Sequence, residues 1–204
     1  MRLLIVDDHA IVRQGLVRLL AAGGAHQLRE AASGREALSA LAEFRPDLII
    51  LDLDMPGLGG IELLRQLIEA GAHRILVLTM HVEPLYVRRA LEAGAQGYVT
   101  KNASPDELQL AIQRLAAGQR YVEAEVAQSL VLDDGTQRST LDHLSTRELE
   151  ILRLLSHGAS LNDIAVALGV SYKTVANNCS FIKSKLGVGR TTDLVRLALD
   201  AGLT

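Results

Sequence analysis

The sequence is poor in features that mark several protein classes. It has one cysteine and no tryptophan, and its six histidines are scattered without the spacing of a metal site. A single cysteine excludes an intramolecular disulfide. No apolar run approaches the roughly 18 residues of a membrane span, and Asp7 and Asp8 stand where a signal peptide would be apolar. These absences predict a cytoplasmic protein with no membrane partner.

Two further absences narrow the function. The chain has no G-x-x-x-x-G-K-[ST] phosphate-binding loop, which argues against a nucleotide-hydrolysing switch. The formal net charge of −3 decides neither for nor against nucleic acid, because an acidic region can mask a small basic surface. The order of the motifs along the chain is more informative.

Strands and helices alternate five times in the first 118 residues. The predicted strands are short runs separated by helical patterns: Leu3–Val6, Leu48–Leu51, Ile75–Leu78 and Gly97–Thr100, with a weaker strand signal near Gln27–Ala31. The run Leu48–Leu51 indicates a strand buried on both faces, and Pro56 and Gly57 predict a turn soon after it. This alternation predicts an α/β domain over residues 1–118 with a parallel sheet covered by helices on both sides.

The pattern changes after Gly118. Residues 119–140 predict a partly helical linker that ends in the polar stretch 133–140. Residues 141–204 predict an all-helical domain, because the strand signal disappears and three helices open on the serine caps Ser145, Ser160 and Ser171. The turn at Gly169 between two of these helices predicts a helix-turn-helix.

Acidic residues follow two of the predicted strands. In a sheet of order 2-1-3-4-5, strands one and three are neighbours, so Asp7, Asp8 and Asp52 are expected to converge at the carboxyl edge. Carboxylates this close repel one another unless a cation lies among them, and Mg²⁺ fits such oxygen ligands best. Thr79 and Lys101 end the next two strands and bring a hydroxyl and an ammonium to the same edge. Together these groups favour phosphoryl transfer onto a carboxylate.

These residues resemble the receiver domain of bacterial response regulators. The resemblance covers about the first 118 residues and is carried by the acidic pair, Leu51–Gly57, Thr79 and Gly97–Lys101. It implies a flavodoxin-like fold with a five-stranded parallel sheet of order 2-1-3-4-5. It also implies that Asp52 is the phosphoacceptor and that Lys101 pairs with the phosphoryl group.

The resemblance assigns the remaining positions of the site. Asp7 and Asp8 would hold Mg²⁺, with Asp52 and the backbone carbonyl of Asp54 as further ligands. Thr79 would hydrogen-bond the phosphoryl group, and Tyr98 would be the aromatic side chain that swings inward when the threonine moves. The sequence departs from the pattern at Asn102, where many receivers have proline, and at Asp54, where asparagine is common.

Two other functions share parts of this pattern. Asp52-Leu53-Asp54 resembles the nucleophile motif of haloacid-dehalogenase-like phosphatases, but there the motif lies in the first strand and not the third. Many turnovers of a phosphate monoester would indicate that enzyme, whereas stoichiometric labelling would indicate a receiver and no enzyme. The second alternative is a receiver-like regulator controlled by protein or ligand contact without phosphate.

The second helix of the helix-turn-helix has a polar, basic face opposite its core stripe. Val175, Cys179, Ile182 and Leu186 form the core stripe, so Cys179 is interpreted as a small buried hydrophobe and not a redox sensor. Such a helix fits the major groove of double-stranded DNA. The predicted DNA-binding residues are Lys173, Thr174, Ala176, Asn177, Ser180, Lys183, Lys185 and Arg190.

This segment resembles the LuxR-type helix-turn-helix, through Leu144–Glu148, Ile164-Ala165, Thr174-Val175 and Lys185–Val188. Its pairing with a receiver places the chain in the NarL/FixJ class of response regulators. That resemblance implies a transcriptional regulator phosphorylated by a partner sensor histidine kinase and homodimeric when active. The reading face departs from the class at Ala176 and Asn178, where lysine and histidine are usual, which predicts fewer phosphate contacts.

Overall fold

A computed structural model describes residues 1–22, 26–55, 60–132, 141, 144–201 and 203. The predicted turn at Pro56 and Gly57 and the polar stretch 133–140 lie outside these residues. The chain divides into two compact units, Met1–Asp133 and Asp134–Thr204, and each is described by itself. Among the described residues, no helix is both long enough and apolar enough to cross a membrane.

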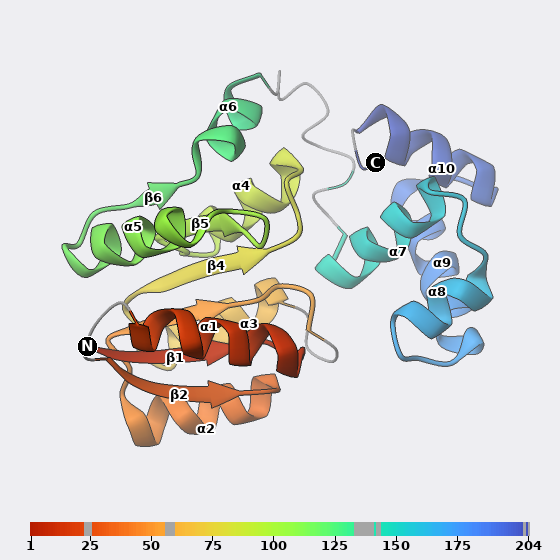
Figure 1. Ribbon diagram of the computed structural model, residues 1–204. Helices are drawn as coiled ribbons and strands as arrows, with labels where there is room; N and C mark the ends of the chain where they lie inside the picture. The colour runs from red at the N-terminus through yellow and green to blue at the C-terminus, as the bar shows by residue number, and fades with distance from the viewer. Residues whose placement is uncertain (23–25, 56–59, 133–140, 142–143, 202, 204) are drawn as a thin grey trace. The chain divides into compact units, whose positions relative to one another are not determined.

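The first unit alternates strands and helices, as predicted (Figure 1). Its elements are β1 (Arg2–Val6), α1 (Ala10–Ala22), β2 (Gln27–Ala31), α2 (Gly34–Phe44), β3 (Leu48–Leu51), α3 (Gly60–Glu69), β4 (Ile75–Thr79), α4 (Pro84–Glu92), β5 (Gly97–Thr100), α5 (Pro105–Ala116), β6 (Tyr121–Val122) and α6 (Ala124–Leu132).

All strands of this sheet are parallel, in the order β2-β1-β3-β4-β5-β6. Val6 pairs with Leu51 at the carboxyl ends of β1 and β3, and the Asp52 amide donates to the Val6 carbonyl at 2.9 Å. Because Asp7 and Asp52 directly follow these paired residues, they lie side by side at one edge. The predicted parallel sheet with the order 2-1-3-4-5 is confirmed.

Hydrophobic side chains fill both faces of the sheet. Leu4, Val6 and Leu51 point to the face covered by α2, α3 and α4. Leu3 and Ile5 point to the opposite face, which α1 and α5 cover (Figure 1). Since alternate residues of one strand face opposite cores, the central strands are apolar throughout, and polar groups occur only where these strands end.

Strand β6 is a difference from the predicted five-stranded sheet. Two residues, Tyr121 and Val122, pair with Gly97 and Tyr98 at the free edge of β5. Helix α6 follows, and its Val126 is buried in the core shared with α2, α3 and α4. Residues 121–132 therefore pack with the first unit, although the sequence pattern predicts a linker from residue 119.

The second unit consists of helices α7 (Thr146–Ser156), α8 (Leu161–Ala167), α9 (Tyr172–Leu186) and α10 (Thr191–Asp200). The predicted serine caps are present: Ser145, Ser160 and Ser171 each accept a hydrogen bond from the backbone amide three residues later, at 3.1–3.2 Å. Such caps satisfy amides that a helix leaves unpaired at its start. They define where α7, α8 and α9 begin.

Candidate functional site

Asp52 lies in a buried ion-pair cluster at the carboxyl edge of the sheet. Its side chain is 1% exposed, and its Oδ2 lies 2.7 Å from the Nζ of Lys101. The same ammonium lies 2.8 Å from Oδ2 of Asp7, whose side chain is 2% exposed. The Asp54 amide donates to the other oxygen of Asp52 at 3.2 Å. The structure thus brings the predicted phosphoacceptor, one acidic partner and the predicted lysine into direct contact.

Burial and charge act in opposite directions on this cluster. Burial raises the pKa of Asp52 to about 6, although the contact with Lys101 acts against that rise. Burial would lower the pKa of Lys101, but its hydrogen bonds to Asp52 and Asp7 outweigh burial and raise it. Lys101 is therefore charged, and Asp52 is mostly ionised at neutral pH. An ionised carboxylate next to a fixed cation is suited to attack an electrophilic phosphorus.

Asp8 and His9 extend the cluster toward solvent. Ligand atoms of Asp7, Asp8, His9 and Asp52 all lie within 4.8 Å of one another. Oδ1 of Asp8 lies 2.9 Å from Nδ1 of His9. Three carboxylates at one edge are the donor set that suits Mg²⁺, a hard cation that prefers oxygen ligands. The predicted acidic cluster is present, and its residues fit this ion.

The carboxylate of Asp54 faces a different set of partners. Its Oδ2 accepts a hydrogen bond from the hydroxyl of Thr79 at 3.3 Å, and its Oδ1 lies 2.5 Å from Nε2 of His81. Burial would raise the pKa of Asp54, but the hydrogen bond and charge of His81 outweigh it and hold that pKa below its usual range. Thr79, predicted to serve a phosphoryl group on Asp52, thus donates to a neighbouring carboxylate in this structure.

The start of α3 fixes the backbone near Asp54. A Cβ atom on Gly60 would lie 2.2 Å from the Cα of Leu53, a distance that excludes any side chain there. Glycine at position 60 therefore allows the helix to pass directly against the segment between Asp52 and Asp54. This close approach helps to set the positions of both carboxylates.

Tyr98 is completely buried, and its hydroxyl donates to the backbone carbonyl of His81 at 2.9 Å. Burial raises the pKa of this phenol, so it stays protonated and remains a donor. The side chain that the sequence predicts as the switch therefore points inward. Through residue 81 it is connected to the Thr79–Asp54 pair.

His81 and His9 are the residues that sequence reasoning missed. His81 follows Thr79 by two positions and His9 follows Asp8 directly, so each stands beside a predicted site residue at the end of a strand. Their positions shortly after predicted strands were the sequence signal that could have identified both histidines as site residues. Burial would lower the pKa of His81, but its contacts with Asp54 and Glu83 raise it to about 9, so its imidazole is charged at neutral pH.

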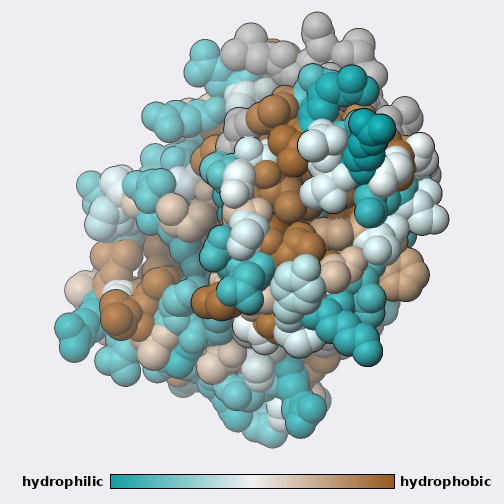
Figure 2. Space-filling model, turned by 90° about the vertical axis from the view of Figure 1, so that its right-hand side faces the viewer, coloured by the Kyte–Doolittle hydropathy of each residue, from teal (hydrophilic) through white to brown (hydrophobic). Residues whose placement is uncertain are grey.

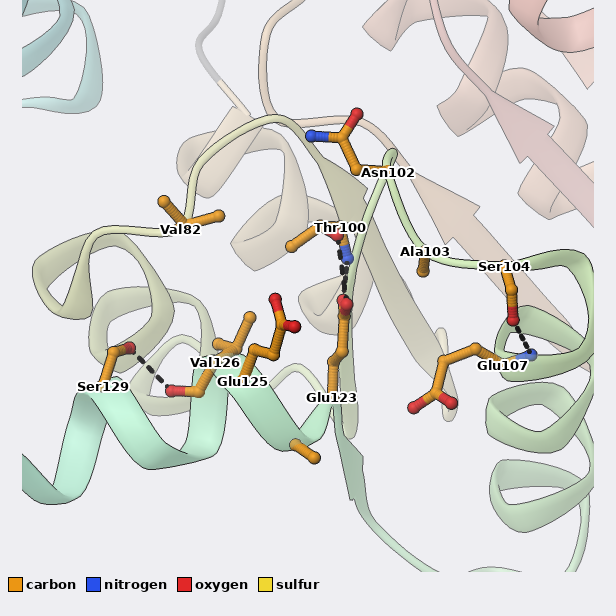
Figure 3. Close-up of a pocket in the computed structure, with 11 residues that line it drawn as sticks. Val82, Thr100, Asn102, Ala103, Ser104, Glu107, Glu123, Glu125, Val126 and Ser129 are labelled. Atoms are coloured by element: carbon orange, nitrogen blue, oxygen red, sulfur yellow. Dashed lines mark hydrogen bonds between the residues drawn. The ribbon is translucent and has the colours of Figure 1, made fainter.

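A separate pocket of about 640 Å³ lies between the β4–α4 loop, the start of α5 and the start of α6 (Figure 3). Glu107, Glu123 and Glu125 line it together with Val82 and Val126. Glu123 accepts a hydrogen bond from the amide of Thr100 at 2.7 Å. None of the predicted phosphoryl-transfer residues lines this pocket, and its carboxylates do not suit an anionic ligand.

Helices α8 and α9 form the predicted helix-turn-helix, with a buried side and an exposed side on α9. Val175, Cys179 and Ile182 are buried, as predicted. The structure leaves most of the predicted DNA-binding positions exposed and two of them half-buried, Ala176 and Lys183. The exposed ones are Lys173, Thr174, Asn177, Ser180, Lys185 and Arg190.

Lys185 has a second partner within its own unit. Its Nζ lies 2.7 Å from Oε2 of Glu148, near the start of α7, and this carboxylate also accepts from the Ser145 amide at 2.7 Å. Burial would raise the pKa of Glu148, but Lys185 and Ser145 lower it. Lys185 therefore links α9 to α7, a contact that the sequence pattern did not predict.

The surface around these helices is mixed in character. Figure 2 looks onto the side that α8, α9 and α10 occupy in Figure 1, and hydrophilic residues there border a group of hydrophobic ones. The exposed large apolar side chains of the second unit include Val166, Tyr172, Phe181 and Leu199.

Comparisons with known proteins agree with both units. Residues 3–113 match the family described as response regulator receiver domain, and residues 142–198 match the family described as bacterial regulatory proteins, luxR family. The transcriptional activator protein ExaE of Pseudomonas putida is 39% identical over 209 residues, covering 100% of this chain and 98% of ExaE. The response regulator UvrY of Escherichia coli is 35% identical over 205 residues, covering 98% of this chain and 94% of UvrY.

A solved structure extends the likeness to the fold. RcsB from Salmonella enterica serovar Typhimurium, bound to the promoter rprA in the presence of the phosphomimetic BeF₃⁻, is 26% identical with a TM-score of 0.63, covering 97% of this chain and 98% of RcsB. Both family matches and the full-length relatives agree with the resemblance found in the sequence. The chain belongs to the NarL/FixJ response regulators, DNA-binding transcriptional regulators of two-component systems that join a receiver domain to a LuxR-type helix-turn-helix domain.

Proposed function

We propose that Asp52 is the phosphoacceptor and that a partner sensor histidine kinase is the donor. The observation that carries this proposal is the contact of buried Asp52 with Lys101 at 2.7 Å, at the edge where Asp7 and Asp8 also lie. An oxygen of Asp52 forms the new bond to phosphorus, while the bond from phosphorus to the donor imidazole breaks and leaves its electron pair on nitrogen. Lys101 then pairs with the oxygens of the transferred group.

Mg²⁺ would be held by the carboxylates of Asp8 and Asp52, with Asp7 beside them and the backbone carbonyl of Asp54 as a further ligand. When bound, it would neutralise the crowded carboxylates and the incoming phosphoryl oxygens. Asp7 keeps Lys101 in place through its contact at 2.8 Å. The carboxylates would thus bind the cation, and Lys101 would bind the oxygens of the phosphoryl group.

The output is DNA binding by the exposed face of α9. Lys173, Asn177 and Ser180 lie on that face and are free of the buried stripe. The protein would bind double-stranded DNA in this way in the cytoplasm of a bacterium. Phosphorylation would favour a homodimer whose two α9 helices bind half-sites about one helical turn apart.

The test is labelling of the full-length protein with acetyl phosphate and Mg²⁺, followed by mass spectrometry. Wild type is expected to gain one phosphoryl group and Asp52→Asn none, while both proteins still bind DNA non-specifically. Asp47→Asn is the matched control, because Asp47 precedes β3 as Asp52 follows it. Undiminished labelling of Asp52→Asn would refute the assignment, and many turnovers of a phosphate monoester would indicate a phosphatase.

A further inference from the structure

Thr79, His81 and Asp54 form a second polar group beside the phosphoacceptor. His81 is 3% exposed and comes from the loop that leaves β4. Its Nε2 contacts Asp54 at 2.5 Å, and its ring stacks on Tyr86 with the ring centroids 3.9 Å apart. The ring is therefore fixed from its edge and from its face.

The backbone of residue 81 is also fixed on both sides. Its amide donates to the hydroxyl oxygen of Thr79 at 3.3 Å, and its carbonyl accepts from the hydroxyl of Tyr98 at 2.9 Å. His81 therefore contacts Asp54 through its ring, and Thr79 and Tyr98 through its backbone. A change at Asp54, Thr79 or Tyr98 therefore affects the other two through His81.

The hydrogen count at Thr79 limits what its hydroxyl can do. A hydroxyl has one hydrogen, and here it is donated to Oδ2 of Asp54 at 3.3 Å. While that bond exists, Thr79 cannot donate to a phosphoryl oxygen on Asp52. The carboxylate of Asp54 is an anion with acceptor oxygens, like the phosphoryl group, and its charge is compensated by His81.

We propose that the Asp54 carboxylate, positioned by His81, is an internal stand-in for the phosphoryl group that binds the Thr79 hydroxyl and keeps Tyr98 buried before phosphate arrives. This inference rests on the proposed function, because it assumes that the phosphoryl group on Asp52 later takes the same hydroxyl. Asp54 and His81 are positioning residues and not catalytic ones.

The proposal has two consequences of different kinds. Without phosphate, loss of the Asp54 carboxylate frees Thr79 and lets Tyr98 leave its buried position. With phosphate, the same loss removes a competing acceptor and a nearby negative charge. Removing such a competitor is expected to tighten the binding of a phosphoryl analogue by about two- to tenfold.

The experiment follows Tyr98 by NMR of the full-length protein with ¹³C-labelled tyrosine, and the Tyr98→Phe spectrum assigns the signal. In Asp54→Ala without phosphate, the Tyr98 signal is expected to move away from its wild-type position. Asp54→Asn, which keeps one oxygen but not the charge, should move it less. Beryllofluoride with Mg²⁺ should return the signal in both variants and should bind Asp54→Ala more tightly than wild type.

The matched control is Asp47→Ala, which removes a carboxylate at the other end of β3 and should leave the Tyr98 signal unchanged. An unmoved Tyr98 signal in Asp54→Ala would overturn the proposal. So would a moved signal that bound beryllofluoride does not restore, because that outcome indicates a general structural role. Weaker beryllofluoride binding by Asp54→Ala would also overturn it.

Failure of the proposed function is recognised separately. If acetyl phosphate does not label Asp52 in wild type, the phosphoacceptor assignment fails, whereas the comparison of Tyr98 signals without phosphate still decides the role of Asp54. His81→Asn provides a second route to the same answer. It keeps the backbone contacts of residue 81, removes the ring that holds Asp54, and should move the Tyr98 signal in the same direction as Asp54→Ala.

Discussion

Replacement of Lys101 by methionine tests the electrostatics of the site directly. The ammonium of Lys101 lies within 2.8 Å of both Asp7 and Asp52, and these carboxylates are 2% and 1% exposed. Methionine has a similar shape but no charge. The substitution leaves two buried carboxylates side by side without the cation that compensates them.

The expected cost is about 3 kcal/mol in the free energy of unfolding of the first unit. Removing one partner of a buried ion pair costs roughly 3–5 kcal/mol, and the low end applies because the Lys101 side chain keeps 12% exposure to solvent. A typical domain has about 5–15 kcal/mol of stability, so the variant should remain folded. The same loss makes the site a stronger cation site, because Lys101 no longer competes for the oxygens of Asp52.

The assay is urea unfolding of the full-length protein with and without Mg²⁺, followed by tyrosine fluorescence. The chain has no tryptophan, and three of its four tyrosines, Tyr86, Tyr98 and Tyr121, lie in the first unit. Mg²⁺ at roughly 100 times its Kd should stabilise the folded state by about 2.7 kcal/mol. At one fixed Mg²⁺ concentration, Lys101→Met should gain more than wild type.

Lys173→Met is the control, because it makes the same change at an exposed lysine of the other unit. A loss below about 1 kcal/mol in Lys101→Met would mean that the lysine does not compensate the two carboxylates. An equal gain from Mg²⁺ in wild type and variant would mean that the ion and Lys101 do not share oxygens. Either result refutes the electrostatic reasoning.

Three further predictions concern the second unit. Glu148→Gln should lower the stability of the second unit by only about 1 kcal/mol at pH 7, because Lys185 is 42% exposed and solvent screens the pair. Since the folded-state pKa of Glu148 is lowered, this contribution exists above the usual pKa of 4.5 and is lost as the pH falls below it. Thermal melts of wild type and variant should therefore converge in acid. Hydrogen peroxide should leave DNA affinity unchanged, because Cys179 is buried and burial raises its pKa; an oxidant effect that disappears in Cys179→Ser would contradict this. Lys173→Met should weaken binding to all DNA sequences alike and reduce the salt slope by about 1, and a selective loss at one sequence would show base contact instead.

Most of the fold could be predicted because buried parallel strands leave a strong signal. The predicted ranges Gln27–Ala31, Leu48–Leu51 and Gly97–Thr100 agree with β2, β3 and β5. Leu48–Leu51 is a short apolar run ended by Asp52, since a strand covered on both faces must be apolar until it leaves the sheet, whereas the edge strand Gln27–Ala31 contains three polar residues. Strand β6 was missed because two residues are too few to show a period.

The site could be predicted only where strand order brings residues together. Asp7 and Asp52 follow the neighbouring strands β1 and β3, Lys101 follows β5 at the same carboxyl edge, and the structure shows Lys101 in contact with both carboxylates. The contact of His81 with Asp54 joins residues 27 positions apart through two loops, and that of Lys185 with Glu148 joins residues 37 positions apart through two helices. Loop conformation and helix packing decide such pairs, and no sequence pattern encodes them.

The enclosed position of Lys101 also makes it a natural chemical reporter. It is the sole lysine before Lys173 in the sequence, and its amine is held between two carboxylates and largely shielded from solvent. Amine-acylating reagents should therefore modify the helix-turn-helix lysines quickly and Lys101 slowly. The rate of this slow reaction measures how often the acidic edge of the receiver opens locally, and the measurement needs no substitution.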